Sequence, residues 1–324
     1  MPDAEGLLLS VTEVRAETPL VRAFTLARPH GEPLPTWQPG AHIRVRLPGG
    51  DDRCYSLINL SPDPHATTRP TAYRLGVRLE DPSQGGSRFM HGLKTGDQVE
   101  VLAPSNNFPL EPGPQPVVLL AGGIGITPIV SMAAALAAQG RPYRLYYAGR
   151  SRGDLAFVGD IERLCGPHLA LHTDAAAGRV FDVDGLFASL KAEEPVYCCG
   201  PRAMIDAALS AAKAWGWAEG RLRFELFTVA GPQASDGPFE VVLKSSGESF
   251  LIPPGKTILD VLIEAGKDPL HDCKRGDCGI CQVQVLEGVP DHRDYILTDA
   301  ERAEGTKMQI CVSRSKTPRL VIDL

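Results

Sequence analysis

Short stretches in which apolar and polar residues alternate, separated by turn residues, make up the first third of the chain. Each stretch has the length of a β-strand, and no clear amphipathic helix interrupts them. The predicted strands are Leu7–Val14, Val21–Ala27, His42–Leu47, Arg53–Ile58, Tyr73–Leu79 and Gln98–Leu102. Six short strands of this kind predict a small antiparallel β-barrel over residues 1–111.

The pattern changes after the proline-rich segment 109–116, which is typical of a domain boundary. Beyond it, buried strands alternate with helical stretches, which predicts βαβ units and a parallel sheet. The strands are Val117–Ala121, Arg144–Ala148, Leu169–Thr173 and Val196–Cys198, and two of the helices are Ile129–Ala138 and Ala203–Trp215. We therefore predict an α/β domain over residues 112–229.

A third domain is predicted after a polar linker at 230–238 that is rich in Gly and Pro. In this part of the chain, Phe239–Lys244 and Ser249–Ile252 predict a hairpin and Ile258–Ala265 predicts a helix. A group of closely spaced cysteines follows the helix. We place this domain at residues 238–324, which makes the chain a multidomain protein.

Composition and charge exclude several classes of protein. The 324 residues are 43% hydrophobic and 22% charged, as in globular proteins. With 33 basic and 39 acidic residues the net charge is −6, so no basic surplus is present to bind a nucleic acid. The uncharged segment 117–138 is long enough to span a membrane, but the glycines and the proline within it favour strand, loop and helix. The acidic start lacks the basic region of a secretory signal, so we expect a cytoplasmic protein.

Four cysteines in the last quarter of the chain are the strongest chemical signal. Cys273, Cys278 and Cys281 have the spacing C-x4-C-x2-C, and Cys311 follows after 29 intervening residues. Four thiolates can hold two irons with two sulfur ligands each, so this spacing favours a plant-type [2Fe-2S] cluster. A structural zinc site, which more often uses two C-x2-4-C knuckles, and unrelated core thiols are the alternatives.

Two motifs lie where predicted strands of the α/β domain end. The glycines of Gly122–Pro128 (GGIGITP) allow the backbone to approach a pyrophosphate at the start of a helix. Pro128 stands where the usual dinucleotide fingerprint has its third glycine, and an ordinary tight turn is the alternative. The second motif is Tyr197–Pro201, in which Cys199 either faces a cofactor or packs the sheet together with Cys198.

Two weaker motifs belong to the predicted barrel. The segment Arg53–Leu57 (RCYSL) ends a strand, and its alternation separates Arg53 and Tyr55 from Ser56 unless the strand bends. The loop Gly85–Arg88 (GGSR) could hold one phosphate together with Arg53. Alone, each segment is more typical of an ordinary strand or turn than of a binding site.

The four motifs occur in the same order as in the phthalate dioxygenase reductase family. The chain resembles that family over essentially its whole length. Members of that family are single-chain FMN and [2Fe-2S] reductases that serve Rieske oxygenases such as vanillate O-demethylase. The resemblance implies an antiparallel β-barrel flavin domain, an α/β parallel-sheet nucleotide domain and a β-grasp plant-type ferredoxin domain. It also implies FMN, NADH and a [2Fe-2S] cluster as cofactors.

The resemblance further implies site residues. Those expected to bind the flavin are Arg53, Tyr55, Ser56, Gly76, Val77, Arg78, Gly85, Gly86 and Ser87. Those expected to bind the nicotinamide nucleotide are Gly123, Gly125, Ile126, Thr127, Cys199, Gly200 and Pro201. Ser56, near flavin N5, and Cys199, near the nicotinamide, are the expected catalytic residues. Phe227 ends a segment, 224–227, that leads out of the nucleotide domain beside the flavin. The expected cluster ligands are Cys273, Cys278, Cys281 and Cys311.

The implied function is electron transfer from NADH through FMN to [2Fe-2S] and on to a terminal Rieske-type oxygenase that acts on an aromatic or similar small substrate. A flavin is needed because a hydride carries two electrons, whereas the cluster accepts one. A monomer with no nucleic-acid or membrane partner is expected. Arg150 and Arg152, after the second predicted strand, favour NADPH by themselves, whereas the resemblance favours NADH.

Three other functions are alternatives to this one. A reductase for another acceptor, such as a cytochrome P450, fits the same motifs. A stand-alone electron carrier would need only the last domain, and the nucleotide motifs upstream argue against it. A hydroxylase that acts directly on substrate would need a metal site such as two His and one carboxylate, and His91, His271 and His292 lie isolated in the sequence.

Overall fold

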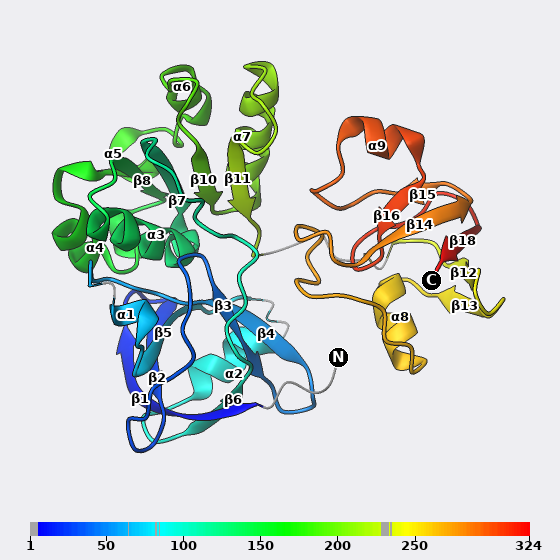
Figure 1. Ribbon diagram of the computed structural model, residues 1–324, viewed down its shortest axis with the longest axis horizontal. Helices are drawn as coiled ribbons and strands as arrows, with labels where there is room; N and C mark the ends of the chain where they lie inside the picture. Colours follow the sequence, from blue (N-terminus) through cyan, green and yellow to red (C-terminus); the bar gives the residue numbers. More distant parts are fainter. Residues whose placement is uncertain (1–5, 64, 82, 84, 228–232, 234) are drawn as a thin grey trace. The chain divides into compact units, whose positions relative to one another are not determined.

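The computed structural model describes residues 6–63, 65–81, 83, 85–227, 233 and 235–324 (Figure 1). The chain divides into two compact units, Met1–Glu225 and Leu226–Leu324. The start of the chain and most of the linker predicted at 230–238 lie outside the described residues.

The first unit begins with an antiparallel sheet in the order β4-β3-β6-β1-β2-β5. Its strands are β1 (Leu7–Ala16), β2 (Val21–Ala27), β3 (His42–Arg46), β4 (Asp52–Ser56), β5 (Ala72–Arg78) and β6 (Gln98–Val101). The two edge strands meet just after β4, where Leu57 pairs with Leu75 and the N–H of Ile58 donates to Arg74 O at 2.9 Å. The sheet therefore closes into a barrel, which confirms the prediction of an antiparallel flavin-type domain.

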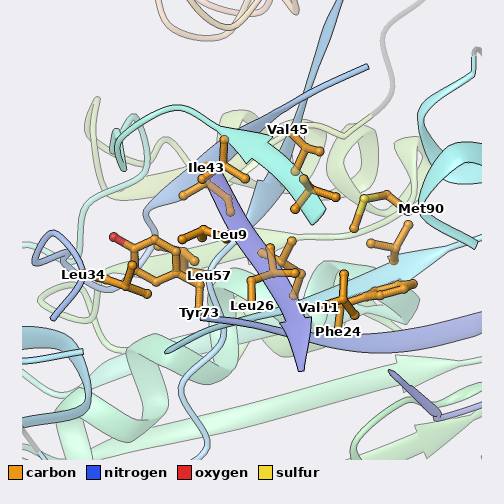
Figure 2. Close-up of a cluster of buried hydrophobic side chains, with 14 of the residues drawn as sticks. Leu9, Val11, Phe24, Leu26, Leu34, Ile43, Val45, Leu57, Tyr73 and Met90 are labelled. Carbon is orange, nitrogen blue, oxygen red and sulfur yellow. The ribbon is translucent and has the colours of Figure 1, made fainter. Parts of the chain in front are cut away.

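The core of the barrel consists of the inward-facing residues of these strands (Figure 2). Alternation places Leu9 and Val11 of β1 inside, and likewise Phe24 and Leu26 of β2. Two helices, α1 (His65–Thr68) and α2 (Gly86–Gly92), accompany the strands. No sequence pattern indicates α2, because this helix begins and ends with glycine, a poor helix former. Burial of Met90 against the barrel core stabilises it.

The second part of this unit is a parallel sheet in the order β11-β10-β7-β8-β9. Its strands are β7 (Val117–Gly122), β8 (Tyr143–Gly149), β9 (Leu169–Thr173), β10 (Val196–Cys199) and β11 (Leu222–Glu225). The connecting helices are η1 (Gly123–Gly125), α3 (Ile126–Ala138), η2 (Arg152–Asp154), α4 (Val158–Cys165), η3 (Gly166–His168), α5 (Asp174–Ala177), α6 (Val183–Ala188) and α7 (Arg202–Ala214). The strand order reverses between β7 and β10, and ligands of open α/β sheets bind at such a switch point.

Helix α3 begins at Ile126, three residues before the predicted start. Pro128 therefore lies in the first turn, where a backbone N–H has no partner within the helix and its loss costs little. The uncharged segment 117–138 folds as β7, η1 and α3, as the glycines predicted. Among the described residues, no helix combines the length and the apolar character needed to cross a membrane.

The second unit contains a mixed sheet in the order β13-β12-β18-β14-β16. Its elements are β12 (Phe239–Leu243), β13 (Ser249–Ile252), α8 (Ile258–Glu264), β14 (Gln282–Glu287), β15 (Pro290–Asp291), α9 (Asp299–Glu304), β16 (Lys307–Gln309), β17 (Arg314–Ser315) and β18 (Arg319–Asp323). The predicted hairpin and helix are β12, β13 and α8. Strand β18 pairs with β12 in parallel, and buried residues of α8 join the sheet in one core, as expected for a ferredoxin-type domain.

Candidate cofactor sites

The ends of β7 and β10 bring the two nucleotide-binding motifs into direct contact. A Cβ atom added to Gly125 would lie 2.2 Å from Cys199 O and 2.7 Å from Gly200 N. One added to Gly122 would lie 2.5 Å from Pro201 Cδ. Only glycine permits this approach, so Gly122 and Gly125 are explained by the packing of the second motif against them. The structure thus brings together residues 122–125 and 199–201 at the switch point of the sheet.

The start of α3 gives this site its affinity for anions. Gly125 is the N-cap residue and has no side chain to cap the helix. The 13-residue helix therefore presents backbone N–H groups and the positive end of its dipole beside the glycines. Thr127 is 1% exposed, and its hydroxyl donates to Ile124 O at 3.0 Å, which holds the loop in place. A pyrophosphate fits this donor set.

Two cysteines and a glutamate line the carboxyl ends of β10 and β11. Cys198 and Cys199 are fully buried, and burial raises the pKa of Cys198 to about 12, which keeps that thiol protonated and unreactive. Cys199 pairs in register with Glu225, which is 3% exposed. Glu225 is a buried carboxyl group that the sequence analysis did not single out, although it lies in the segment 224–227 that the analysis noted.

The barrel and the parallel sheet meet at residues from both predicted sites. A Cβ atom on Gly76 of β5 would lie 3.0 Å from Thr127 Cγ2 and 3.0 Å from the ring of Phe157. Ser131 of α3 is fully buried; its hydroxyl donates to Leu57 O at 2.8 Å and accepts from the N–H of Asn59 at 2.8 Å. Helix α3 thus lies against the barrel (Figure 1), and the residues predicted for flavin and nucleotide share one junction.

Two residues of this junction were missed by the sequence analysis. Phe157 has a left-handed backbone conformation, with φ at +61°, and no sequence signal indicates that its ring reaches Gly76. Ser131 offers a weak signal, because it is a polar residue in an otherwise apolar helix.

A second set of predicted flavin residues converges on α2. A Cβ atom on Gly86 would lie 2.6 Å from Arg53 Cγ and 2.9 Å from the hydroxyl of Tyr55. Burial raises the pKa of Tyr55, so its hydroxyl stays neutral and able to donate. Together, Arg53 and Tyr55 provide donors beside a glycine at which a ligand can approach the backbone. This arrangement fits the phosphate of a flavin mononucleotide.

The rest of the loop is held by its own hydrogen bonds. The Ser87 hydroxyl accepts from the N–H of Glu80 at 3.1 Å and lies 3.0 Å from the Ser83 hydroxyl. Arg78 Nη1 donates to both carboxylate oxygens of Glu80, at 2.7 and 2.8 Å. A surface pocket near the loop is lined by Leu20, Arg78, Leu79, Glu80, Asp81 and Arg88. Two arginines therefore accompany the predicted phosphate site.

Three predicted residues need a more specific description. The side chain of Val77 packs in the barrel core and its carbonyl is hydrogen-bonded to His91 Nε2 at 2.9 Å, so any role in binding would come from its main chain. Ser56 is 5% exposed and pairs in register with His42. Phe227 is half-buried and belongs to the second unit, and its place beside a flavin stays a prediction.

The four cysteines of the second unit converge. Cys273, Cys281 and Cys311 are each at most 5% exposed, whereas Cys278 is partly exposed. The side chain of Cys273 is hydrogen-bonded to Cys278 and Cys311, and that of Cys281 to Cys311. These bonds, first of all the one from Cys278, lower the pKa of Cys273. One segment, 273–281, and the distant Cys311 therefore supply one sulfur site.

The loop around these cysteines has the curvature that a cluster site needs. Gly276 and Gly279 both have φ at +77°, and Lys274, at +51°, is also left-handed. A Cβ on Gly276 would lie 2.6 Å from Val312 Cγ2, so only glycine fits there. The N–H of Arg275 donates to Cys273 Sγ at 3.2 Å, as expected for a loop that stabilises negative charge on sulfur.

The donor set fits a [2Fe-2S] cluster. The side chains of Cys273, Cys278, Cys281 and Cys311 converge, and such a cluster requires four sulfur ligands, two on each iron.

Two parts of the chain match known protein families. The family described as the 2Fe-2S iron-sulfur cluster binding domain matches residues 241–316, and the oxidoreductase NAD-binding domain family matches residues 119–210. The chain is 36% identical to phthalate dioxygenase reductase from Burkholderia cepacia, over 100% of this chain and 99% of that protein. It is 39% identical to vanillate O-demethylase oxidoreductase from Pseudomonas sp. (strain HR199 / DSM 7063), over 93% of this chain and 95% of that protein.

Solved structures show the same architecture. Phthalate dioxygenase reductase, described as a modular structure for electron transfer from pyridine nucleotides to [2Fe-2S], matches with a TM-score of 0.74 and 35% identity over 98% of each chain. Full-length CYP116B46 from Tepidiphilus thermophilus matches with a TM-score of 0.77 and 36% identity over 98% of this chain. Our chain spans 42% of the length of that second structure.

The barrel, the parallel sheet and the cysteine site thus define an NAD-dependent iron-sulfur oxidoreductase of the flavoprotein reductase type. The chain belongs to the phthalate dioxygenase reductase-like family. Proteins of this family use NADH, FMN and [2Fe-2S], and they carry electrons as reductase components of oxygenase systems.

Proposed function

We propose that this chain is the reductase component of a two-component oxygenase system, with a terminal oxygenase of the Rieske type that acts on an aromatic or similar small substrate. The observation that carries the proposal is the junction at α3, where the predicted flavin and nucleotide residues meet, in one chain with a four-cysteine site. Relatives named for phthalate, vanillate and toluene-4-sulfonate oxygenation support an oxygenase as the partner.

The nucleotide residues bind and orient. Gly123 and Gly125, with the first turn of α3 at Ile126 and Thr127, hold the pyrophosphate through backbone N–H groups. Cys199, Gly200 and Pro201 pack against these glycines and set the wall on which the nicotinamide lies. The ring of the nucleotide would then extend towards Gly76, which lies beside Thr127 at the junction with the barrel.

The barrel residues hold the flavin. Arg53, Tyr55 and Gly86, with Gly85 and Ser87, bind its phosphate, and Gly76 to Arg78 line its ring. When bound, the flavin converts the two-electron chemistry of a nicotinamide into the one-electron chemistry of an iron-sulfur cluster. Ser56 and Cys199, both buried, would exclude water from the ring faces.

The four cysteines would hold the cluster. Cys273, Cys278, Cys281 and Cys311 would supply the four sulfur ligands that two irons require, and the cluster would accept one electron at a time. Backbone N–H groups such as that of Arg275 stabilise the charge on the sulfurs.

We also propose the domain limits 1–111, 112–229 and 238–324 for the flavin, nucleotide and ferredoxin domains. We further propose that the protein is a monomer and that it lies in the cytoplasm.

Reconstitution tests the function. The purified chain should contain flavin and iron, and should reduce cytochrome c with NADH in the absence of any aromatic substrate. Added aromatic acids alone should not be hydroxylated, whereas a Rieske oxygenase added with them should yield product. Hydroxylation by the chain alone, or a preparation that holds no iron after anaerobic reconstitution, would show that the proposal is wrong.

A cytochrome P450 is the second candidate acceptor. The specific observation is the match to the full-length CYP116B46 structure, in which the matching part accounts for 42% of one longer chain. Coupling assays with a Rieske oxygenase and with a bacterial P450, at equal concentrations, distinguish the two candidates. Product formed only with the P450 would favour this second function.

A further inference from the structure

One fully buried amide lies beside the cluster site. Gln309 ends β16 and is 0% exposed. Its immediate neighbours along the chain, Met308 and Ile310, belong to the apolar core of the second unit. Burial of a primary amide in such a core costs free energy unless its donors and its acceptor find partners. The position therefore needs an explanation beyond packing.

The partners of Gln309 lie on both sides of its side chain. Its carbonyl Oε1 accepts from the Cys281 thiol at 3.5 Å, and its Nε2 donates to Gln282 Oε1 at 3.1 Å. Gln282 and Gln309 face each other in register on β14 and β16. The amide thus connects an exposed glutamine with a predicted cluster ligand.

With the Gln309 amide in this orientation, Cys281 is a protonated thiol, because its sulfur is the hydrogen-bond donor. As a cluster ligand the sulfur is a thiolate, which has no proton to donate and can only accept. A half-turn about the Cγ–Cδ bond of Gln309 exchanges its oxygen and its NH2 group, which have nearly the same shape. The NH2 group then faces the sulfur. The same half-turn at exposed Gln282 lets it donate to Gln309 Oε1, so both amides keep a partner.

We propose that Gln309 donates an N–H···S hydrogen bond to Cys281 when this sulfur ligates the cluster, and that the bond raises the reduction potential of the cluster. A donor stabilises negative charge on sulfur, and the reduced cluster carries one more negative charge than the oxidised one. Gln309 acts through Cys281 and is a positioning residue; its amide rotates and no proton is transferred. The inference rests on the proposed cluster site.

Redox titration of the full chain tests the inference. Gln309→Met keeps the length of the side chain and removes its donor. Gln284→Met is the matched control, because Gln284 is an exposed glutamine on β14, the strand that pairs with β16. The midpoint of cluster reduction is followed by the electron paramagnetic resonance signal of the reduced cluster, together with iron content. We expect the equilibrium constant for cluster reduction to fall about tenfold in Gln309→Met, which lowers the midpoint potential by about 59 mV for one electron. In the control, the midpoint potential should stay unchanged.

A second measurement does not depend on the stability of a variant. Wild-type protein labelled with 15N at the glutamine side-chain amides should show a 15N coupling to the reduced cluster in pulsed resonance spectra, and labelled Gln282→Met should retain it. An unshifted midpoint in a fully loaded Gln309→Met, or no 15N coupling in the wild type, would overturn the inference. A wild-type chain that forms no cluster would instead refute the proposed function.

Discussion

Gly125 shows how one residue determines the geometry of the nucleotide site. The carbonyl of Cys199 occupies the place where any side chain at this position would begin, with only 2.2 Å to a Cβ atom. A backbone atom cannot rotate away as a side chain can. Any substitution must therefore move the end of β7 or of β10, and with it the site at the switch point.

We expect Gly125→Ala to lower kcat/KM for NADH by about 10- to 100-fold, because overpacking of this kind costs about 1–3 kcal/mol. Steady-state kinetics with ferricyanide measure the effect. The control is Gly159→Ala in α4, where a Cβ meets nothing within 4 Å. Equal kinetics for Gly125→Ala and wild type would mean that the two motifs need not touch during binding.

Cys278→Ser should remove or destabilise the cluster, because serine replaces one of four sulfur ligands. Cytochrome c reduction should fall steeply, while NADH–ferricyanide activity stays largely intact, since that acceptor can draw electrons from the flavin. The comparison variant is Cys165→Ser, a buried cysteine of α4 outside the proposed cluster site, which should retain its iron. Unchanged iron content and both activities intact in Cys278→Ser would exclude this residue as a ligand.

Among single residues, the sequence predicts those that can be recognised from their spacing or residue type alone. The cysteine spacing and the glycine loops are of this kind, and the structure brings each set together. Ser131, Phe157 and Gln309 could not be predicted, because their partners lie far away in the chain, as Leu57 does from Ser131. Which long-range contacts a lone serine or glutamine makes is determined by the fold, and local pattern carries no information about it.

At the scale of elements, α3 couples the two halves of the first unit. Its first turn forms part of the nucleotide site, and one turn later Ser131 is bound to the chain just after β4. A shift of the helix therefore moves both predicted cofactor sites together. The pattern of apolar residues predicted this helix, but not its early start, since the proline suggested a boundary.

Ser131→Ala should lower the free energy of unfolding by about 1–3 kcal/mol, because it leaves the carbonyl of Leu57 and the N–H of Asn59 buried without this partner. Urea unfolding measures the loss, and KM for NADH should rise as the helix shifts. The control is Ser189→Ala at an exposed position, which removes a hydroxyl that donates to Leu186 O in its own turn. It should have little effect on the free energy of unfolding or on KM for NADH. A Ser131→Ala protein as stable as wild type would show that the two halves are held by other contacts.

The end of β8 bears on the choice between NADH and NADPH. Arg152 is already paired with Glu162 at 2.7 Å, and Ser151 donates to Asp154 at 2.7 Å in the same turn. Of the two arginines that favour NADPH, Arg152 is thus partly neutralised, whereas exposed Arg150 forms no such ion pair with the described residues. We expect kcat/KM to favour NADH, and Arg150→Ala to leave this preference in place. A preference for NADPH that disappears in Arg150→Ala or Arg152→Ala would contradict the expectation.

The whole molecule consists of two units, each with a hydrophobic core of its own. The barrel core of the first unit and the core around α8 in the second share no residue. All residues proposed for flavin and nucleotide, apart from Phe227, lie in the first unit, and all proposed cluster ligands lie in the second. The classes of the barrel and of the α/β part could be predicted from periodicity, because periods of two and 3.6 distinguish them, whereas the ferredoxin class followed from the family resemblance.

A chain that ends at residue 227 should therefore fold and bind flavin without the ferredoxin domain. We expect it to contain stoichiometric FMN, since Arg53, Tyr55 and Gly86 form a compact site for one phosphate. Acid release followed by chromatography identifies the flavin, and the full-length chain serves as the control. With NADH the truncated protein should reduce ferricyanide at a rate close to that of the full chain, while its cytochrome c reduction should be largely lost because no cysteine of the cluster site remains. Recovery of FAD would contradict the phosphate site, and cytochrome c reduction at the full rate would show that electrons reach that acceptor without passing the cluster.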